Sequence, residues 1–350
     1  SLALADIDGD GDLDLYIANY RVTTMRDEPA SQIKGEYVNG RMVLRSYNDI
    51  PATHPDLEGR FTLSADGQVI EHGEIDMLYR NDGAWRFTHL PFDSAVFQDE
   101  EGRPLQSVPR DWSLSCAFRD INGDGAPDLY VCSDFESPDR IWLNDGRGNF
   151  RAMSTLAVRH TSLFSMGVDF ADLNRDGHLD FLVADMLSRN RTEHHTRDRL
   201  PYSAAGWEAR PQFANNMVYL NRGDGTFAEV AWLARLEASG WTWSPACLDV
   251  DLDGWEDLLA TTGNQLDSLD LDVIQEASRL KSQRTFGREE LLNLRHLFKP
   301  LRSPNHAFRN ERNLTFSDQT EKWGFGSADI SHGLAFADLD LDGDLDVAVN

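Results

Sequence analysis

The segment Asp120-Ile-Asn122-Gly-Asp124-Gly125-Ala-Pro-Asp128 decides the fold of this chain. Side-chain oxygens stand at its positions 1, 3, 5 and 9, and ligands of this kind suit a hard cation. Glycine at position 6 permits the sharp turn that aims them inward. A backbone carbonyl at position 7 and water would complete a shell of about six to eight oxygens, which favours Ca²⁺ over the stricter Mg²⁺. The segment therefore predicts a calcium loop.

The same pattern, D-x-[DN]-x-D-G-x-x-D, occurs five times, so the sequence predicts up to five Ca²⁺ sites. A metal-free Asp/Gly turn explains one such loop equally well. Five loops in one register, however, each crowd three or four carboxylates together, and their repulsion requires a counter-charge. The predicted ligands, including the carbonyl donor at position 7, are Asp6, Asp8, Asp10, Asp12 and Asp14; Asp120, Asn122, Asp124, Ala126 and Asp128; Asp172, Asn174, Asp176, His178 and Asp180; Asp249, Asp251, Asp253, Trp255 and Asp257; and Asp338, Asp340, Asp342, Asp344 and Asp346.

The flanks of these loops exclude EF-hands. An EF-hand requires a bidentate Glu at position 12, where the five loops carry only Ile, Val or Ala. The residues that follow each loop, such as Leu13-Asp-Leu-Tyr-Ile17, have the pattern of a short buried strand rather than a helix. We therefore expect the loops to join β-strands.

A second motif alternates with the loops. It consists of an aromatic-bearing strand, an Asn/Gly turn and a second strand that is closed by Phe, and this pattern predicts a β-hairpin. We attribute its Asn and Gly residues to turn chemistry. The motif occupies residues 78–87, 141–150, 218–227 and 307–316.

Together the two motifs define a repeat. Three hairpins end 22 residues before the next loop, and the shortest full repeat, from Asp120 to Asp172, has 52 residues. Four antiparallel strands in that length are typical of a β-propeller blade, whereas a β-sandwich does not predict two alternating motifs. We therefore predict an all-β fold, a single partial β-propeller over 1–350 with about four and a half four-stranded blades. Because the chain starts and stops inside motifs, we expect a piece of a longer protein.

Three repeats are longer than the shortest one, and their extra residues fall at 21–76, 187–214 and 264–304, between strands 2 and 3 of a blade. The last of these inserts has the apolar stripes of helices. Strands alternate in direction across a blade, so we expect the inserts to share one face and the acidic loops the other. Inserts on one face of a repeat fold often carry the binding surface. The middle insert is rich in Arg, which is consistent either with an anionic partner or with a solvated loop.

Composition excludes several classes of function. A net charge of −26 argues against nucleic-acid binding, and no apolar run is long enough for a membrane-spanning helix. The adjacent His194-His195 pair lacks the spacing of a zinc site, and no other group suggests catalysis, so we expect a protein that is not an enzyme. Cys116 and Cys132 flank one loop, which leaves a disulfide and two buried thiols both open.

Three segments carry a resemblance to a known family: Asp111-Trp-Ser113, Phe118 to Val131, and Ser165 to Gly177. They make the chain similar to FG-GAP/VCBS repeat proteins, whose propellers include the integrin α-chain head. More closely, the chain resembles the bacterial proteins related to cartilage acidic protein that usually end in an ASPIC/UnbV domain. The resemblance implies a calcium-binding, integrin-like propeller in secreted or surface proteins with binding or adhesion roles.

These observations lead to one main functional hypothesis and two alternatives. The main one is a calcium-binding scaffold for an unknown protein or glycan ligand, located outside the cell, on its surface or in the periplasm. The first alternative is a carbohydrate-active enzyme, a lyase or hydrolase, that uses the inserted face. The second is a structural spacer within a larger surface protein.

Overall fold

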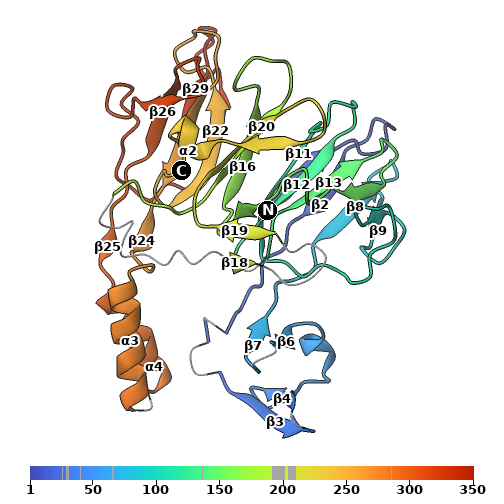
Figure 1. The fold of residues 1–350 in the computed structure, drawn as a ribbon, viewed down its shortest axis with the longest axis vertical. Coiled ribbons are helices and arrows are strands. Elements are labelled where there is room, and N and C mark those ends of the chain that lie inside the picture. Colours follow the sequence, from blue (N-terminus) through green and yellow to red (C-terminus); the bar gives the residue numbers. More distant parts are fainter. Residues whose placement is uncertain are drawn as a thin grey trace.

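The computed structural model describes residues 1–25, 27–28, 31–39, 41–64, 67–135, 137–190, 202–203, 210–284 and 286–350. Its described strands include four antiparallel blades and a further two-stranded sheet, β28–β29 (Figure 1). The predicted all-β propeller of about four and a half four-stranded blades is therefore confirmed. In spatial order the blades are β1 (Leu2–Ala5), β2 (Asp14–Ile17), β8 (Met77–Asn81) and β9 (Phe87–Leu90); β11 (Ser113–Arg119), β12 (Asp128–Ser133), β13 (Arg140–Asn144) and β14 (Phe150–Ala152); β16 (Gly167–Ala171), β17 (Asp180–Ala184), β20 (Met217–Asn221) and β21 (Phe227–Glu229); β22 (Thr242–Leu248), β23 (Asp257–Thr262), β26 (His306–Asn310) and β27 (Phe316–Asp318); and β28 (Leu334–Ala337) with β29 (Asp346–Val349).

The first strand of each blade lies beside the first strand of the next, so that β1, β11, β16 and β22 follow one another. Two elements lie in the connections between blades. Strand β10 (Phe97–Gln98) pairs in parallel with β14 and adds a fifth strand to the second blade. The short helix α2 (Ala231–Ala234) follows β21 and packs against β20.

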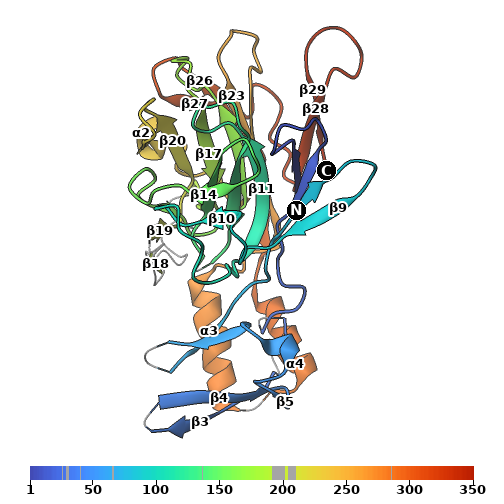
Figure 2. The ribbon, with the colours of Figure 1, turned by 90° about the vertical axis from the view of Figure 1, so that its right-hand side faces the viewer.

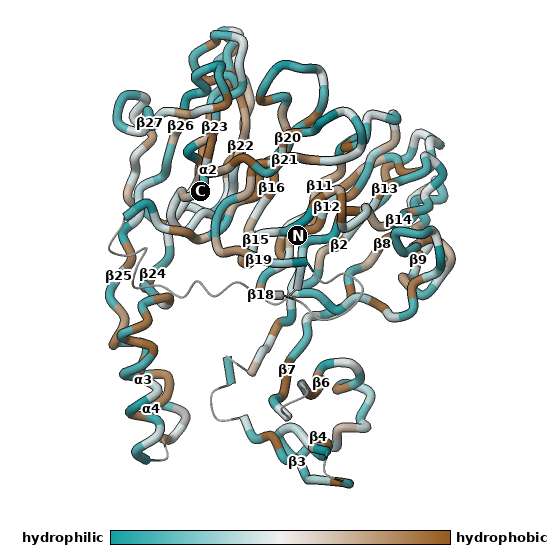
Figure 3. The backbone as a smooth tube through the Cα atoms, in the orientation of Figure 1, coloured by the Kyte–Doolittle hydropathy of each residue, from teal (hydrophilic) through white to brown (hydrophobic). Residues whose placement is uncertain are grey.

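The hydrophobic core lies between the blades rather than inside one closed barrel. In β12, Leu129 and Val131 pack toward the first blade, while Tyr130 and Cys132 pack toward the third. Both faces of this strand are buried, which explains why its sequence is a continuous apolar run without polar alternation. Figure 3 shows the hydrophobic colour concentrated in such strands and the hydrophilic colour in the loops that join them.

The alternating faces also decide the state of the cysteines. Cys116 lies opposite Val131 in the register of β11 and β12, and it packs toward the first blade, whereas Cys132 packs toward the third. All three cysteines are free thiols. No described helix combines the length and hydrophobicity that a membrane crossing requires.

The described parts of the inserts lie between the second and third strands of their blades and project from one end of the propeller, below the blades in Figures 1 and 2. The third insert is helical, as predicted. Residues 191–201 and 204–209, with His194, His195 and most of the basic residues of the middle insert, lie outside the described residues. The described insert elements are β3 (Ile33–Val38), β4 (Arg41–Tyr47), β5 (Ile50–Pro51), the 3-10 turn η1 (Pro55–Leu57), β6 (Phe61–Leu63) and β7 (Val69–Glu71) in the first; β18 (Tyr202–Ser203) and β19 (Pro211–Phe213), which form a sheet with β15 (Thr161–Ser162), in the second; and β24 (Asn264–Leu266), α3 (Leu271–Gln283), α4 (Arg288–Asn293), the 3-10 turn η2 (Leu294–Leu297) and β25 (Pro300–Leu301) in the third.

A polar contact, which we call the clasp, closes each blade at its insert end. An Asp or Asn just before the third strand accepts a hydrogen bond from a backbone N–H at the end of the second strand and also bonds a Ser hydroxyl of the following blade. In the second blade, Asp139 accepts from the N–H of Ser133 at 2.9 Å and from the hydroxyl of Ser165 at 2.9 Å. The four clasp pairs are Asp76 with Ser113, Asp139 with Ser165, Asn216 with Ser239, and Asn305 with Ser331.

Whether the clasp residue is Asp or Asn correlates with the third residue of the second strand, which is Tyr in some blades and Leu in others. In the first two blades a buried Tyr donates its hydroxyl to the clasp carboxylate, as Tyr130 does to Asp139 at 2.7 Å. In the third and fourth blades, Leu182 and Leu259 occupy the position of that Tyr, and the clasp residue is Asn. An additional hydroxyl donor therefore accompanies a carboxylate, which can accept more hydrogen bonds than an amide.

In an Asp139→Asn variant, the Tyr130 hydroxyl should lower the stability of the fold instead of raising it. Tyr130→Phe should destabilise the wild type by about 1 kcal/mol, the net value of one hydrogen bond, but stabilise the Asp139→Asn variant, in which that hydroxyl is buried without an acceptor, by about 1–3 kcal/mol. Urea unfolding in saturating Ca²⁺ measures all four proteins. Tyr16→Phe, in the clasp of the first blade, is the control and should cost the same in both backgrounds. Equal costs for Tyr130→Phe in the two backgrounds would contradict the assignment.

The clasp should also give the protein a pH dependence. Burial raises the pKa of Asp139 to about 7 from 3.8, and its hydrogen bonds offset only part of that effect. The folded protein then binds this proton more tightly than the unfolded chain, so this residue lowers the free energy of unfolding as pH rises from about 4 to about 7. The slope of stability against pH over that range should be less negative in Asp139→Asn.

Candidate metal centre

The five acidic loops join the first and second strands of the blades, and they have one backbone geometry. In every loop the first Asp accepts hydrogen bonds from the backbone N–H groups at positions 5 and 6. In the second loop, Asp120 accepts from Asp124 at 3.0 Å and from Gly125 at 2.8 Å. The position-5 carboxylate in turn accepts from the N–H at position 7, as Asp124 does from Ala126 at 2.9 Å. These bonds fix the loop without using all the lone pairs of its carboxylates.

The glycine at position 6 is required by its backbone conformation. Its φ lies between +87° and +99° in the five loops, a region that residues with a side chain rarely adopt. In four of the five loops a Cβ would meet nothing within 4 Å, so the constraint is conformational strain rather than crowding. The fourth residue of each loop is also left-handed, even where it is Arg175, Leu252 or Leu341.

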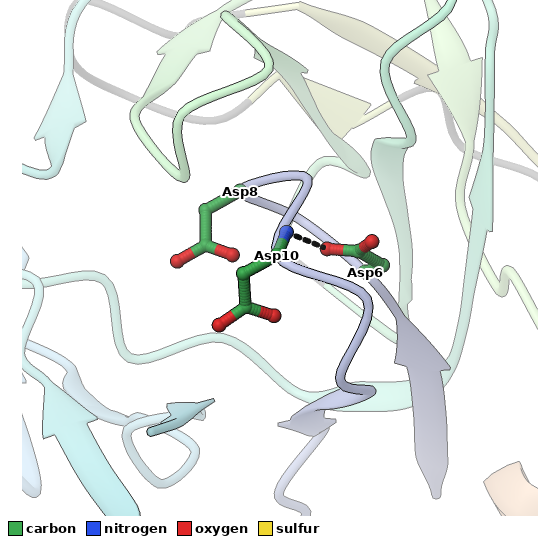
Figure 4. A group of neighbouring side chains, drawn as sticks. All are labelled: Asp6, Asp8 and Asp10. Carbon is green, nitrogen blue, oxygen red and sulfur yellow. Dashed lines mark hydrogen bonds between the residues drawn. The ribbon is translucent and has the colours of Figure 1, made fainter. Parts of the chain in front are cut away.

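Three loops bring carboxylates together. Among the described residues, Asp6, Asp8 and Asp10 form one group whose ligand oxygens lie within 4.8 Å of one another, and Figure 4 shows these side chains around a single turn. The other two groups are Asp249 with Asp251 and Asp257, and Asp338 with Asp340 and Asp346. These are the sets in which positions 1 and 3 converge with position 5 or 9.

The second and third loops differ because their third residue is Asn. The amide of Asn122 donates to the carboxylate of Asp124 at 2.9 Å, and its oxygen accepts from the N–H of the same residue. Asn174 makes the same two bonds with Asp176 in the third loop. These loops hold one negative charge fewer, while the amide oxygen remains a suitable ligand for a hard cation.

In the four full blades the ninth residue is a buried carboxylate that connects the loop to the blade. Asp128 is fully buried and accepts from the N–H of Ile121 at 2.9 Å and from the N–H of Asn144 at 2.8 Å. Burial raises its pKa to about 7, against the effect of these hydrogen bonds, and the charge of Asp124 raises it further. The same bonds recur at Asp14, Asp180 and Asp257. A bound cation would stabilise the charged form of such a group.

The hairpin asparagines do more than the turn chemistry that we assigned to them from the sequence. Besides donating its N–H to the ninth residue, Asn144 donates its side-chain amide to the carbonyl of Ile7, in the loop of the preceding blade, at 2.9 Å. Asn221 bonds Ile121 and Asn310 bonds Leu173 in the same way. Each of these three Asn residues therefore supports the loop of its own blade and that of its neighbour.

The clasp was also missed from the sequence, although a fixed spacing could have revealed it. In every blade the clasp Asp or Asn lies five residues before the hairpin Asn.

The fourth loop contains a counter-charge from the protein itself. Arg309 contacts Asp251 at 2.5 Å and Asp253 at 2.7 Å, and Arg312 contacts Asp253 at 2.6 Å. The residue equivalent to Arg309, immediately before the hairpin Asn, is Leu143 in the second blade and Leu220 in the third. Two arginines therefore bind the carboxylates at positions 3 and 5, whose oxygens a cation would use. Among the described loops, only the fourth has arginines in this role.

The predicted donor set fits a calcium ion in type and spacing. Each loop offers carboxylate or amide oxygens at positions 1, 3 and 5 and a carboxylate at position 9, and hydrogen bonds already hold the backbone in the turn. At position 7, Asp12, Ala126, His178, Trp255 and Asp344 each donate their N–H to the position-5 carboxylate, which fixes the peptide whose carbonyl would be the remaining ligand. Hard oxygen donors in this number suit Ca²⁺ better than transition metals.

Comparison with protein families agrees with this repeat geometry. The FG-GAP-like repeat matches residues 120–183, 205–260 and 296–349. The chain contains FG-GAP-like repeats. The first blade lies outside the matched segments, but its loop and hairpin make the same hydrogen bonds as those of the matched repeats.

Other comparisons add little. No curated protein matches the chain. Among solved structures 40 chains match, including an Agrocybe aegerita lectin described as recognising non-reducing terminal N-acetylglucosamine. That match has 16% sequence identity and a TM-score of 0.27, and it covers 91% of this chain and 78% of the other. A likeness this low assigns neither a fold nor a ligand.

Arg309→Leu should lower the stability of the calcium-free protein and raise the Ca²⁺ affinity of the fourth loop. Without Ca²⁺ the variant should be slightly less stable, because it loses a partly exposed ion pair. Its fourth loop should bind Ca²⁺ several-fold more tightly, because the ion no longer competes with the guanidinium. Calorimetric titration measures the affinity and urea unfolding in chelator measures the stability. Arg80→Leu, at the same strand position but paired with Asp82 outside the loop, is the matched control and should change Ca²⁺ affinity less. Unchanged affinity in Arg309→Leu would contradict the competition.

Proposed function

We propose that this chain is a calcium-binding propeller that acts as a binding or adhesion scaffold outside the cytoplasm, with a protein or a glycan as its ligand. The observation that carries the calcium assignment is the repeated loop geometry. The five loops vary in residue at positions 2, 4, 7 and 8, yet in each one backbone N–H groups of the loop donate to the side chains at positions 1, 5 and 9. Selection for a turn alone would not require carboxylates at all of these positions.

The location follows from the affinity expected of such loops. Calcium modules that work outside cells bind in the range of about 10⁻⁴–10⁻³ M, a concentration that the cytosol does not supply. The five ions would raise the net charge from −26 to −16, which removes much of the repulsion within the loops. Export to the cell surface, the medium or the periplasm is therefore part of the proposal.

The proposed ligand-binding surface is the face that carries the inserts, because additions to a repeat fold that gather on one face commonly serve recognition. A catalytic role has less support. A hydrolase or lyase requires an acid and a base that reach the substrate, but the carboxyl groups with raised pKa values at the insert end, Asp76, Asp139 and Asp185, are buried and engaged by hydroxyl and N–H donors. The acidic loops lie at the opposite end of the blades.

Removal of calcium should lower the melting temperature, and added Ca²⁺ should restore it by mass action, whereas Mg²⁺ at equal concentration should restore much less. Scanning calorimetry with chelator and each ion measures this effect. Asp124→Ala and Asp176→Ala should each lose about one bound ion by elemental analysis and retain the fold, because other blades hold their own sites. A melting curve unaffected by chelator, with no calcium in the protein, would contradict the assignment.

Removal of the third insert should separate binding from metal-dependent stability. The second blade supplies a natural short connection, because residues 134–138 join Ser133 to its clasp residue Asp139. Grafting these five residues in place of 263–304 should preserve the clasp between Thr262 and Asn305. On an array of neutral and acidic oligosaccharides, the grafted variant should fail to bind glycans that the intact chain binds. The increase in its melting temperature with Ca²⁺ should stay nearly the same. Equal glycan retention would exclude this part of the insert face as the binding surface.

A further inference from the structure

A cleft of about 240 Å³ opens on the insert face at the junction of the third and fourth blades. Three short segments and one further side chain line it: residues 188–190 after β17, 240–241 before β22, 301–304 at the end of the third insert, and His306. No described residue of its lining is acidic, although the chain has 59 acidic and 33 basic residues. The lining instead includes two arginines. The lining of the cleft is therefore positively charged, whereas the chain as a whole is negatively charged.

The backbone holds the walls of this cleft close together. The N–H of Gly240 donates to the carbonyl of Leu187 at 2.9 Å, and the N–H of Gly263 donates to the carbonyl of Trp241 at 3.0 Å. Gly240 has a φ of +80°, and a Cβ there would lie 2.9 Å from the hydroxyl oxygen of Ser303. A residue with a side chain would thus be strained and would push against the opposite wall. The third insert and the start of β22 are consequently fixed against each other.

The two arginines of the cleft differ in their contacts. Arg189 contacts Asp318 at 3.1 Å, and its guanidinium lies 4.8 Å from the centre of the Phe308 ring. These contacts orient it at the wall. Arg302 is exposed and forms no ion pair with any described residue. A guanidinium in this position suits a carboxylate, which it can bind through two parallel hydrogen bonds.

Two buried polar groups of the lining have no hydrogen-bond partner within the described chain: the indole N–H of Trp241 and the Nδ1 atom of His306. Trp241 is 8% exposed, and it lies among the residues that line the cleft. Buried polar groups are nearly always paired, and an unpaired one costs about 1–3 kcal/mol. The indole is only a donor, whereas an imidazole nitrogen donates or accepts according to its tautomer. A hydroxyl group can satisfy both.

We propose that this cleft binds a uronic acid unit of an acidic polysaccharide, with its carboxylate at Arg302 and its ring hydroxyls toward Trp241 and His306. The inference rests on the proposed binding function and names its ligand class. The volume accommodates about one sugar ring, and the lining offers the cation, the donors and the hydroxyl-compatible nitrogen that a hydroxylated acid requires. An acidic peptide offers the carboxylate and backbone groups but no ring hydroxyls, and tetraglutamate in the test below distinguishes the two ligand classes.

The test is calorimetric titration of the 350-residue chain with tetragalacturonate, at a Ca²⁺ concentration that saturates the loops. The fully methyl-esterified tetramer, which retains the hydroxyls but lacks the charge, is the ligand control. Arg302→Gln should weaken binding of the acid at least tenfold, and Trp241→Phe, which removes only the donor and retains a ring, should weaken it several-fold. The matched controls are Arg295→Gln, in the exposed turn η2, and Trp232→Phe, in α2, and both should bind like the wild type.

Several outcomes would overturn the assignment. Equal affinity for the ester, equal loss in the control variants, or no binding of the acid at all would each exclude a uronate site in the cleft. Tighter binding of tetraglutamate than of tetragalacturonate would assign the site to an acidic peptide instead. The melting temperature with and without Ca²⁺, measured on the same samples, separates the two levels of the proposal. A chain that responds to Ca²⁺ and binds other glycans but not the acid retains the proposed function and loses only this inference.

Discussion

The carboxylate at the ninth position of the acidic loop, which is buried in all four full blades, is the contact on which the architecture depends. In the second blade, Asp128 joins the loop, through the N–H of Ile121, to the hairpin, through the N–H of Asn144. The side chain of the same Asn then reaches the loop of the preceding blade at Ile7. A single charged group thus fixes strands 1, 2 and 3 of its own blade and positions the residue that connects two blades. Its burial raises its pKa, so this arrangement is most favourable when a cation lies nearby.

At the other end of the blade the clasp performs the corresponding role with different chemistry. Asp139 and its equivalents connect the second and third strands of one blade to a Ser of the next. Each interface between full blades is therefore held by hydrogen bonds at both ends and by apolar side chains between them. This explains why a blade tolerates long additions between its second and third strands. The clasp at the base of the insert fixes the strand ends whatever the length of the insert beyond them, so the insert can vary without changing the blade.

The sequence was sufficient for the parts of the structure that depend on local pattern. The loop signature and the alternating hairpins predicted four-stranded blades, since the period of each strand and the turn residues are local properties. Apolar periodicity likewise predicted the helices of the third insert. In contrast, the second role of Asn144 was missed, because its partner Ile7 lies 137 residues earlier and belongs to another blade. The partner of Asp139 in the next blade was missed for the same reason. Arg309 was also overlooked, since only the pairing of β23 with β26 brings it to the fourth loop.

The distribution of charge connects the metal sites to recognition. The five loops and the two clasp aspartates hold a little over a third of the 59 acidic residues. There, backbone N–H groups and hydroxyls engage the carboxylates, and a divalent ion would offset their remaining repulsion. The face with the inserts can therefore carry charge of the other sign without neutralising these sites, because the length of a blade separates the two ends and salt screens charges beyond about 8 Å at physiological ionic strength. Within the described chain Arg302 has no acidic partner and can take an anion, while Arg309 is engaged in the fourth loop. Under the proposed function, calcium would govern stability and arginine would govern recognition. The two properties could then change independently, which suits a scaffold whose blades are repeated and whose inserts are not.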